Sequence, residues 1–315
     1  MISSKIRLIL LPLLAFALPG LLPAQTPAPA TNAAPAVYPP TTPGLVLLHD
    51  VVIGKGGDHD LHADICYPQN FSGTLTAVIY IHGGGWKAGS YKNYRIVQLA
   101  RAGFFAASIE YRLSTVAKWP AQIQDCKLGV RWLRANAAQY HVDPDHIGVW
   151  GESAGGHLVA CLGTMGDVPE DEGDGGYPGV SSDVQAVADF FGPTDFTSLT
   201  AANANPYVTS VLELLFGVPH DQNPDLWKSG SPLLYVKAGD PPMLIAHGDS
   251  DRVVPLVQST VFDAALTQAG VPHQFIIVKN GDHGFKPLPG TTTDPSNDEI
   301  NQATYAFFAK YLKRS

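Results

Sequence analysis

Apolar runs and helical periodicities alternate along the chain from about Leu45 onward. Continuous apolar runs are typical of strands buried on both faces of a sheet, and they predict strands at 77–82, 104–112, 147–151, 184–192, 241–248 and 273–278. Apolar residues at helical spacing predict helices at 94–103, 120–140, 153–165, 255–269 and 298–312. Two further apolar segments, 45–54 and 59–68, predict an opening hairpin. This alternation predicts an α/β fold with a mostly parallel central sheet and helices on both faces.

The first 44 residues have a different pattern. Lys5 and Arg7 precede the apolar run 8–18 and a stretch of small residues, which together predict a signal peptide at 1–24, cleaved after Ala24. The run is too short to span a bilayer comfortably, so we expect no stable membrane span after cleavage and a secreted or periplasmic protein. Residues 25–44 are rich in Pro and Ala, which predicts an extended leader that buries no core. The folded domain is expected at 45–315.

Composition and charge exclude several classes of protein. The 315 residues are 45% hydrophobic and 15% charged, so a large core is expected. The net charge of −8 is unfavourable for phosphate binding, so we expect no nucleic-acid partner. No Cys/His cluster has zinc-ligand spacing, and no metal or cofactor is expected. The three cysteines form no disulfide framework and are interpreted as small buried hydrophobes. Cys126 and Cys161 lie in predicted helices and are the one pair to test for a bridge.

The stretch "GESAG" contains a candidate nucleophile, Ser153. It has the form G-x-S-x-G, follows a predicted strand and opens a predicted helix, which is the context that a nucleophile turn requires. The flanking Gly151 and Gly155 lack side chains, so strand and helix can pack closely around a strained turn. The helix N-terminus favours negative charge that develops there. A purely structural strand-to-helix turn remains the alternative at this point.

A serine nucleophile needs a base and an acid, expected in the chain order Ser, Asp or Glu, His. The loop "NGDHGF" places His283 after the strand 273–278, and "HGDSDRVVP" places Asp249 and Asp251 after the strand 241–248. Both loops should emerge at the carboxyl edge of the sheet, beside Ser153.

Other titratable residues are weaker candidates for these roles. His157 lies one helical turn past Ser153 and is expected to support local packing. His247 and Glu152 are expected to have structural or supporting roles.

The second motif, "IHGGGWKAGS", places three glycines after a buried strand. Backbone N–H groups left free in such a loop can stabilise the oxyanion of acyl transfer, and loss of one donor costs on the order of a hundredfold to a thousandfold in rate. A phosphate-binding loop is disfavoured because the G-K-[S/T] ending is missing. The joint occurrence of this loop and the serine turn on successive strands is much more specific than either motif alone.

The segment 194–240 is irregular apart from a short predicted helix around 208–217, and we interpret it as a small cap. Its aromatic residues could cover an acyl site, although for each one alone core packing is the favoured interpretation; they are Phe196, Tyr207, Phe216 and Trp227. The acidic, Gly-rich loop 167–176 lacks the ligand spacing of a known calcium loop, and we expect it to be solvated.

From about Val46 onward the chain resembles α/β-hydrolases of the esterase/lipase group that carry an H-G-G-G-W oxyanion motif. It is most similar to secreted bacterial esterases related to bifunctional acetylxylan and feruloyl esterases, and more distantly to hormone-sensitive-lipase-like enzymes. The matching stretches are "HGGGW", "WPAQIQDCKLGVRWLRANA", "DPDHIGVWGESAGGHL", "FGPTDF", "HGDSDRVVP" and "GDHGF".

The resemblance implies specific roles. Ser153 would be the nucleophile, His283 the base and Asp251, which opens the D-x-x-V-P segment, the acid. The oxyanion donors would be the backbone N–H groups of Gly84, Gly85 and Ala154, and Trp86 would contribute an N–H or line the acyl pocket.

The expected function is hydrolysis of short-chain acyl or feruloyl esters, either small molecules or esters linked to plant cell-wall polysaccharides. Two alternatives remain open: a peptidase or amidase on the same fold, of the prolyl-oligopeptidase or formamidase kind, and a non-catalytic binding protein. The oligomeric state stays open.

Overall fold

In the part of the chain that the computed structural model describes, residues 38, 42–199 and 205–312, eight strands form one sheet in the order β1-β2-β4-β3-β5-β6-β7-β8. They are β1 (Leu45–Gly56), β2 (His59–Pro68), β3 (Leu75–Ile81), β4 (Phe105–Ile109), β5 (Val142–Glu152), β6 (Ala186–Phe190), β7 (Met243–Gly248) and β8 (His273–Val278). The opening hairpin pairs antiparallel, and β3 to β8 run parallel. The predicted signal peptide, 1–24, and most of the predicted leader lie outside the described residues.

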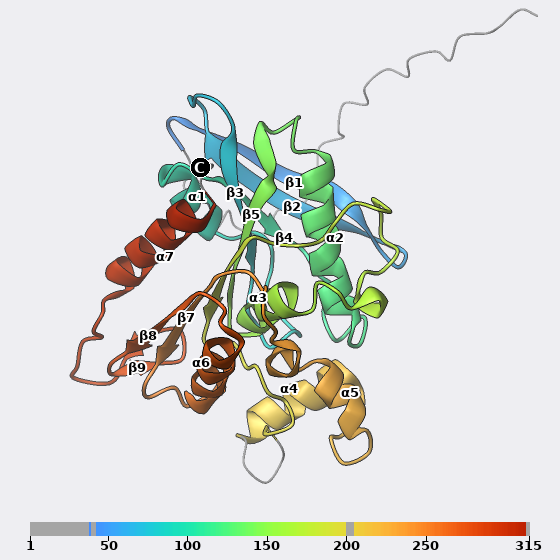
Figure 1. Ribbon diagram of the computed structural model, residues 1–315, viewed down its shortest axis with the longest axis vertical. Helices are drawn as coiled ribbons and strands as arrows, with labels where there is room; N and C mark the ends of the chain where they lie inside the picture. The colour runs from blue at the N-terminus through green and yellow to red at the C-terminus, as the bar shows by residue number, and fades with distance from the viewer. Residues whose placement is uncertain (1–37, 39–41, 200–204, 313–315) are drawn as a thin grey trace, which may run out of the picture. The chain divides into compact units, whose positions relative to one another are not determined.

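Helices cover both faces of this sheet (Figure 1). One apolar cluster joins one face to α1 (Arg95–Arg101) and α7 (Asn297–Tyr311). The other cluster joins the opposite face to α2 (Ala121–Ala135), α3 (Ala154–Thr164) and α6 (Val257–Ala269). This arrangement is the α/β-hydrolase fold, and the predicted fold class is confirmed.

The segment predicted as a cap contains two helices, α4 (Pro206–Phe216) and α5 (Pro224–Ser229), side by side at one end of the sheet (Figure 1). The helix predicted around 208–217 is therefore present. α5 was not predicted, because six residues are too short to show a helical period. Each helix begins at an Asn whose side chain accepts a backbone N–H and continues with Pro, which is a strong start signal: Asn205 for α4 and Asn223 for α5.

Two boundaries differ from the sequence prediction by more than the others. α2 ends at Ala135 instead of 140, because residues 136–141 form turns that lead directly into β5. β5 starts at Val142, which pairs with Leu75 of β3. The start of this strand was not predicted, because polar residues follow Val142 and interrupt the apolar run. A small hairpin of β9 (Gly281–Asp282) and β10 (Lys286–Pro287) also escaped prediction, since strands of two residues have no periodicity.

Several polar segments are more ordered than expected. In the leader, Tyr38 is buried, and its hydroxyl donates to Asp64 at 2.8 Å, so this residue does pack into the core. The acidic loop is not fully solvated: Asp171 is buried, and Glu172 forms ion pairs of 2.9 and 2.8 Å with the buried Lys127 and Arg131 of α2. The expectation of a solvated loop is therefore wrong for these residues, because two buried cations need carboxylate partners.

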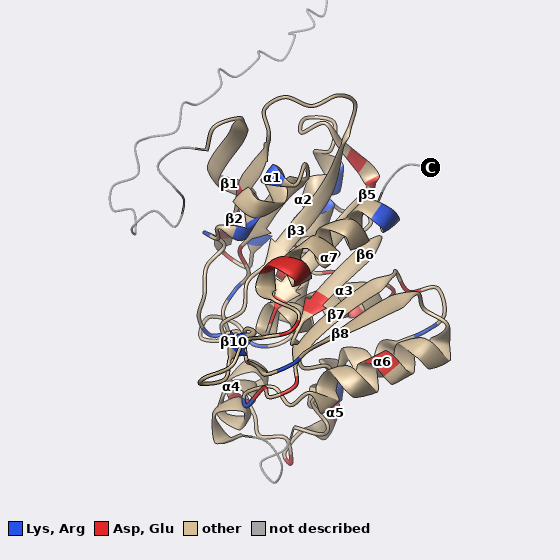
Figure 2. Cartoon of the chain, turned by 90° about the vertical axis from the view of Figure 1, so that its left-hand side faces the viewer, with Lys and Arg blue, Asp and Glu red and all other residues tan. Residues whose placement is uncertain are grey.

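All three cysteines are free and buried, as small hydrophobes are, and Cys126 and Cys161 do not form a bridge. Acidic and basic residues are interspersed along the described ribbon (Figure 2). Among the described residues, no helix has both the length and the apolar character needed to cross a membrane.

Candidate active site

Ser153 occupies a strained turn between β5 and α3. Its φ of 56° and ψ of −118° lie in a region that residues with a side chain rarely adopt. A hydrogen bond of 2.8 Å from its N–H to the carbonyl of Phe190 fixes the turn to the neighbouring strand β6. The predicted strained turn is therefore present, and it lifts the serine hydroxyl above the carboxyl end of the sheet.

The two glycines of the motif are required by space. A Cβ on Gly151 would lie 2.1 Å from the carbonyl oxygen of Gly155. A Cβ on Gly155 would lie 2.1 Å from the carbonyl oxygen of Ile81 in β3. Both contacts are with backbone, which cannot move aside, so the close approach of α3 to the sheet depends on glycine at both positions.

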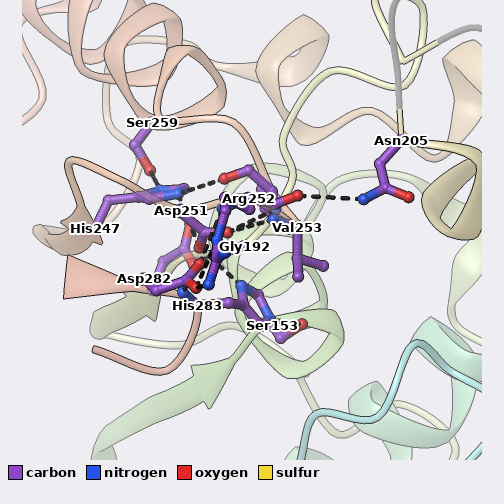
Figure 3. A network of polar contacts seen from close by, with 12 residues as sticks. Ser153, Gly192, Asn205, His247, Asp251, Arg252, Val253, Ser259, Asp282 and His283 are labelled. Atoms are coloured by element: carbon purple, nitrogen blue, oxygen red, sulfur yellow. Dashed lines mark hydrogen bonds and ion pairs between the residues drawn. The ribbon is translucent and has the colours of Figure 1, made fainter. Parts of the chain in front are cut away.

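His283 and Asp251 complete a chain of hydrogen bonds with Ser153 (Figure 3). His283 lies between β9 and β10, and its Nε2 is 3.0 Å from Ser153 Oγ. Its Nδ1 is 2.7 Å from Asp251 Oδ2. The ionised carboxylate can only accept, so Nδ1 carries the proton and the lone pair of Nε2 faces the serine hydroxyl.

The side chain of Asp251 is buried and heavily hydrogen-bonded. Its Oδ1 accepts the N–H groups of Val253 and Val254 at 2.8 and 2.9 Å. Burial by itself raises the pKa of Asp251, but the hydrogen bonds from His247 and His283 outweigh burial and hold the pKa well below its usual range. The side chain of the exposed Asp249 accepts a hydrogen bond from its neighbour Ser250, so the structure brings Asp251, and not Asp249, to the histidine.

Three further polar residues support this arrangement. His247 is fully buried, and its Nε2 lies 2.9 Å from the carbonyl oxygen of Val254. The same nitrogen lies 3.5 Å from Asp251 Oδ2, so His247 contacts the carboxylate that also contacts His283. Asp282 accepts the N–H of His283 at 2.8 Å and pairs with Arg252 (Figure 3).

Glu152, the residue before the serine, forms an ion pair of 2.6 Å with Arg95 of α1. The guanidinium also lies 4.7 Å from the ring centroid of Trp150. This pairing agrees with the supporting role expected for Glu152.

The glycine loop follows β3 and faces Ser153. No acceptor among the described residues takes up the backbone N–H of Gly84 or Gly85. Ala154 is the first residue of α3, so its N–H has no acceptor within the helix. These are the three N–H groups that the resemblance implies as oxyanion donors. Trp86 is buried, and its indole N–H donates to His157 at 3.2 Å, so this N–H points away from the serine.

A cavity of about 400 Å³ opens over Ser153 and His283. The glycine loop and Trp86 form one side. The remaining wall is largely apolar and comes from α4, the loop after β7 and the segment after β6: Tyr207, Val208, Val211, Val253, Val254, Phe191 and Pro193.

The predicted cap aromatics divide between two roles. Phe196, Phe216 and Trp227 are buried in the core. Tyr207 is half exposed and lines the cavity, so it is the one of the four that faces an acyl site. Sequence analysis did not identify Val208 and Val211 as cavity residues. Their spacing of three positions, which places both on one face of α4, was the signal that could have indicated them.

A family model described as BD-FAE matches residues 63–266, which span the glycine loop, the serine turn and the acid. The chain belongs to the BD-FAE family. Esterase LipQ of Mycobacterium tuberculosis is 33% identical to this BD-FAE protein over 242 residues, 75% of this chain and 56% of that esterase. The chain thus spans about half the length of the curated relatives it matches.

Solved structures resemble the whole domain. A truncated form of a carbohydrate esterase from gut microbiota is 32% identical, with a TM-score of 0.74 over 89% of this chain and 99% of that chain. Esterase Est2 of the Planctomycetes species Thermogutta terrifontis, with propionate bound, is 27% identical, with a TM-score of 0.69 over 88% of this chain and 99% of that chain.

Proposed function

We propose that this BD-FAE protein is a serine carboxylic-ester hydrolase that works through an acyl-enzyme. The observation that carries the proposal is the hydrogen-bonded series Ser153–His283–Asp251 at the floor of an apolar cavity, opposite the free N–H groups of the glycine loop. The named esterases among its relatives support the same reaction class.

In the acylation step, Ser153 Oγ bonds to the ester carbonyl carbon while His283 Nε2 takes the hydroxyl proton. Asp251 holds the imidazole in the required tautomer and stabilises its positive charge. The carbonyl oxygen becomes an oxyanion, which accepts hydrogen bonds from Gly84, Gly85 and Ala154. The bond from the carbonyl carbon to the alcohol oxygen then breaks, and His283 gives the proton to the leaving alcohol.

Deacylation repeats these steps with water. His283 removes a proton from a water molecule, the resulting hydroxide attacks the acyl carbon, and a second oxyanion forms at the same three N–H groups. When it collapses, the carboxylic acid leaves and the proton returns from His283 to Ser153 Oγ. The chain's own residues provide every proton transfer in this cycle.

The acyl group is a short-chain or feruloyl group in this proposal. Trp86, Val208 and Val211 line the cavity, and its volume of about 400 Å³ suits a small acyl chain or one aromatic ring. The propionate-bound relative supports short acyl chains. The carbohydrate esterase among the relatives supports an alcohol that belongs to a carbohydrate, and we propose a plant cell-wall polysaccharide. Such a substrate agrees with the signal peptide predicted at 1–24 and with a secreted or periplasmic protein.

The test compares the full chain with Ser153→Ala on p-nitrophenyl acetate, methyl ferulate and acetylated xylan. We expect the parent to hydrolyse all three and the variant to lose turnover by about a millionfold. Serine-dependent turnover of p-nitrophenyl acetate alone would keep the mechanism and remove the polysaccharide assignment. Hydrolysis of a dipeptidyl anilide but of no ester would reassign the site to amide chemistry, and an unchanged variant would refute the mechanism.

A further inference from the structure

The side chain of His157 makes three polar contacts, and two of them join three separate segments of the chain. The third is local, between Nε2 and Cys161 Sγ of the same helix at 3.3 Å. The imidazole Nδ1 is 3.2 Å from the indole Nε1 of Trp86, which follows the glycine loop, 71 residues away. Its Nε2 is 2.7 Å from the carbonyl oxygen of Gly230, just after α5 and 73 residues away. His157 itself lies on α3, one turn after Ser153. One imidazole thus connects the nucleophile helix, the glycine loop and the cap.

The chemistry of its partners fixes the tautomer of this imidazole. An indole N–H can only donate, so Nδ1 must be the unprotonated acceptor. A carbonyl can only accept, so Nε2 must carry the proton. The side chain is fully buried, with the ring of Phe196 at 4.7 Å and that of Trp119 at 5.5 Å. Burial lowers the pKa of His157 to about 4, so both hydrogen bonds persist at neutral pH.

The glycine loop depends on its neighbours for its position. Glycines 83–85 have no side chains that could fix the loop, and the next residue, Trp86, has a φ of 56°, which is unfavourable for a residue with a side chain. Such a conformation persists only where surrounding contacts enforce it. The indole contact to His157 and the hydrogen bond of 2.8 Å from Ser114 N–H to the Trp86 carbonyl are contacts of this kind.

We propose that His157 is a positioning residue. Through Trp86 it holds the N–H groups of Gly84 and Gly85 where they can donate to the oxyanion that forms when Ser153 attacks the ester. Through Gly230 it connects the glycine loop to the cap. The inference rests on the proposed esterase function. His157 touches no substrate, so its influence on the reaction passes through the indole.

Oxyanion contacts strengthen only in the transition state, so displaced donors lower kcat and leave KM nearly unchanged. Complete loss of one donor costs on the order of a hundredfold to a thousandfold. We expect a displaced loop to cost less, about tenfold to a hundredfold in kcat. A residue that contributed only to packing would lower the melting temperature and the folded fraction without changing kcat per active site.

Two substitutions separate the two hydrogen bonds of the imidazole. In His157→Asn, the amide oxygen lies near the position of Nδ1 and can still accept from Trp86. In His157→Gln, the amide N–H reaches the position of Nε2 and can still donate to Gly230, but the indole is left without an acceptor. We expect His157→Gln and Trp86→Phe to lose about tenfold to a hundredfold in kcat with KM within about twofold, and His157→Asn to lose no more than about threefold.

The measurement is steady-state kinetics on p-nitrophenyl acetate with the full chain, normalised by titration of Ser153 with a p-nitrophenyl phosphonate. A trifluoromethyl ketone, which forms a tetrahedral adduct with serine, should bind more weakly in proportion to the loss of kcat/KM. The double variant Trp86→Phe/His157→Gln should be no slower than Trp86→Phe alone, since both changes remove the same contact.

The matched control is Trp227→Phe. Trp227 is also buried, and its indole N–H donates to the carbonyl of Val218 at 3.1 Å, within the cap and away from the glycine loop. We expect this variant to melt earlier and to keep its kcat. If His157→Gln does not fold, the difference between Trp86→Phe and Trp227→Phe decides the question.

Equal loss of kcat in His157→Asn and His157→Gln, or a wild-type kcat in Trp86→Phe, would overturn the proposal. Ser153→Ala, measured in the same series, separates this failure from failure of the esterase mechanism. If Ser153→Ala retains turnover, the esterase mechanism is wrong. If turnover requires Ser153 but kcat does not change when the indole contact is removed, only the role of His157 is wrong.

Discussion

The regions around His283 and His157 place an imidazole close to Ser153 in opposite ways. His283 belongs to a loop between two short strands, its side chain is 23% exposed, and a carboxylate lies on one side and the serine hydroxyl on the other. His157 belongs to a helix and is fully buried between an indole N–H and a carbonyl. In the proposed mechanism the first transfers a proton, whereas the partners of the second fix it in one neutral tautomer.

The difference shows that partners, more than proximity, determine what a histidine does. A carboxylate stabilises an imidazolium, and this is the role proposed for Asp251 beside His283. An indole donor opposes protonation of Nδ1, so His157 can only hold its neighbours in place. Four variants test this contrast.

The largest effect is expected for His283→Ala. Removal of the base should lower turnover of p-nitrophenyl acetate by about a millionfold, because a base and its serine act as one unit. The melting temperature should change little, since His283 is partly exposed on a loop. Retention of more than about 1% of the activity at an unchanged circular dichroism spectrum would remove His283 from the mechanism.

Asp251→Asn should lower kcat by about ten thousandfold. The amide oxygen would replace Oδ1 as acceptor of the Val253 and Val254 N–H groups, so the amide nitrogen would donate to His283 Nδ1. The imidazole proton would then move to Nε2, where it blocks the transfer from Ser153. Asp249→Asn is the matched control and should stay within about twofold, because its side chain does not reach the histidine; comparable losses in both variants would contradict the assignment.

The third variant tests the neutral histidine through acid stability. The pKa of His157 is lowered to about 4, whereas in the unfolded chain it lies near 6.5. Between these two pH values the unfolded state binds more protons than the folded state. The free energy of unfolding of the wild type should therefore decrease by up to about 3 kcal/mol as the pH is lowered from 7 to 4. Asn does not titrate in this range. Urea denaturation should therefore show that the difference in free energy of unfolding between the wild type and His157→Asn is smaller at pH 4 than at pH 7. A constant gap would mean that the imidazole is not held neutral.

The smallest effect is expected for Arg252→Ala. Arg252 is 76% exposed and pairs with Asp282, next to His283. Solvent screens such a pair, so its loss should hardly change the free energy of unfolding, and added salt should reduce the difference further. A large loss of kcat in this variant would show that Asp282 depends on this ion pair to orient the His283 loop.

The sequence predicted the parallel core well because each buried strand is a separate apolar run. β3 and β7 begin and end within two residues of the predicted limits. The same property explains why Ser153, Asp251 and His283 could be named: each follows such a run, and the carboxyl ends of parallel strands meet at one edge. Short elements have no such pattern, so α5 and the β9–β10 hairpin could not be predicted.

Contacts between distant polar residues were also beyond prediction. The link from His157 to Trp86 joins residues 71 apart, and the ion pair from Lys127 to Glu172 joins residues 45 apart. Neither pair has a local spacing that indicates the other partner. The sequence therefore predicted a supporting role for His157 and a solvated acidic loop, and only the folded chain shows which partners these residues have.

The distance along the chain between Ser153 and His283 has a consequence for how the protein is made and measured. The two residues are 130 positions apart, yet their side chains meet at 3.0 Å. During synthesis on the ribosome, the histidine emerges only after β1 to β8 have all been translated, because it follows β8, which pairs with β7. In the proposed mechanism, turnover of a chromogenic ester therefore requires that these distant segments have come together, so a simple colour assay would follow refolding of this protein in real time.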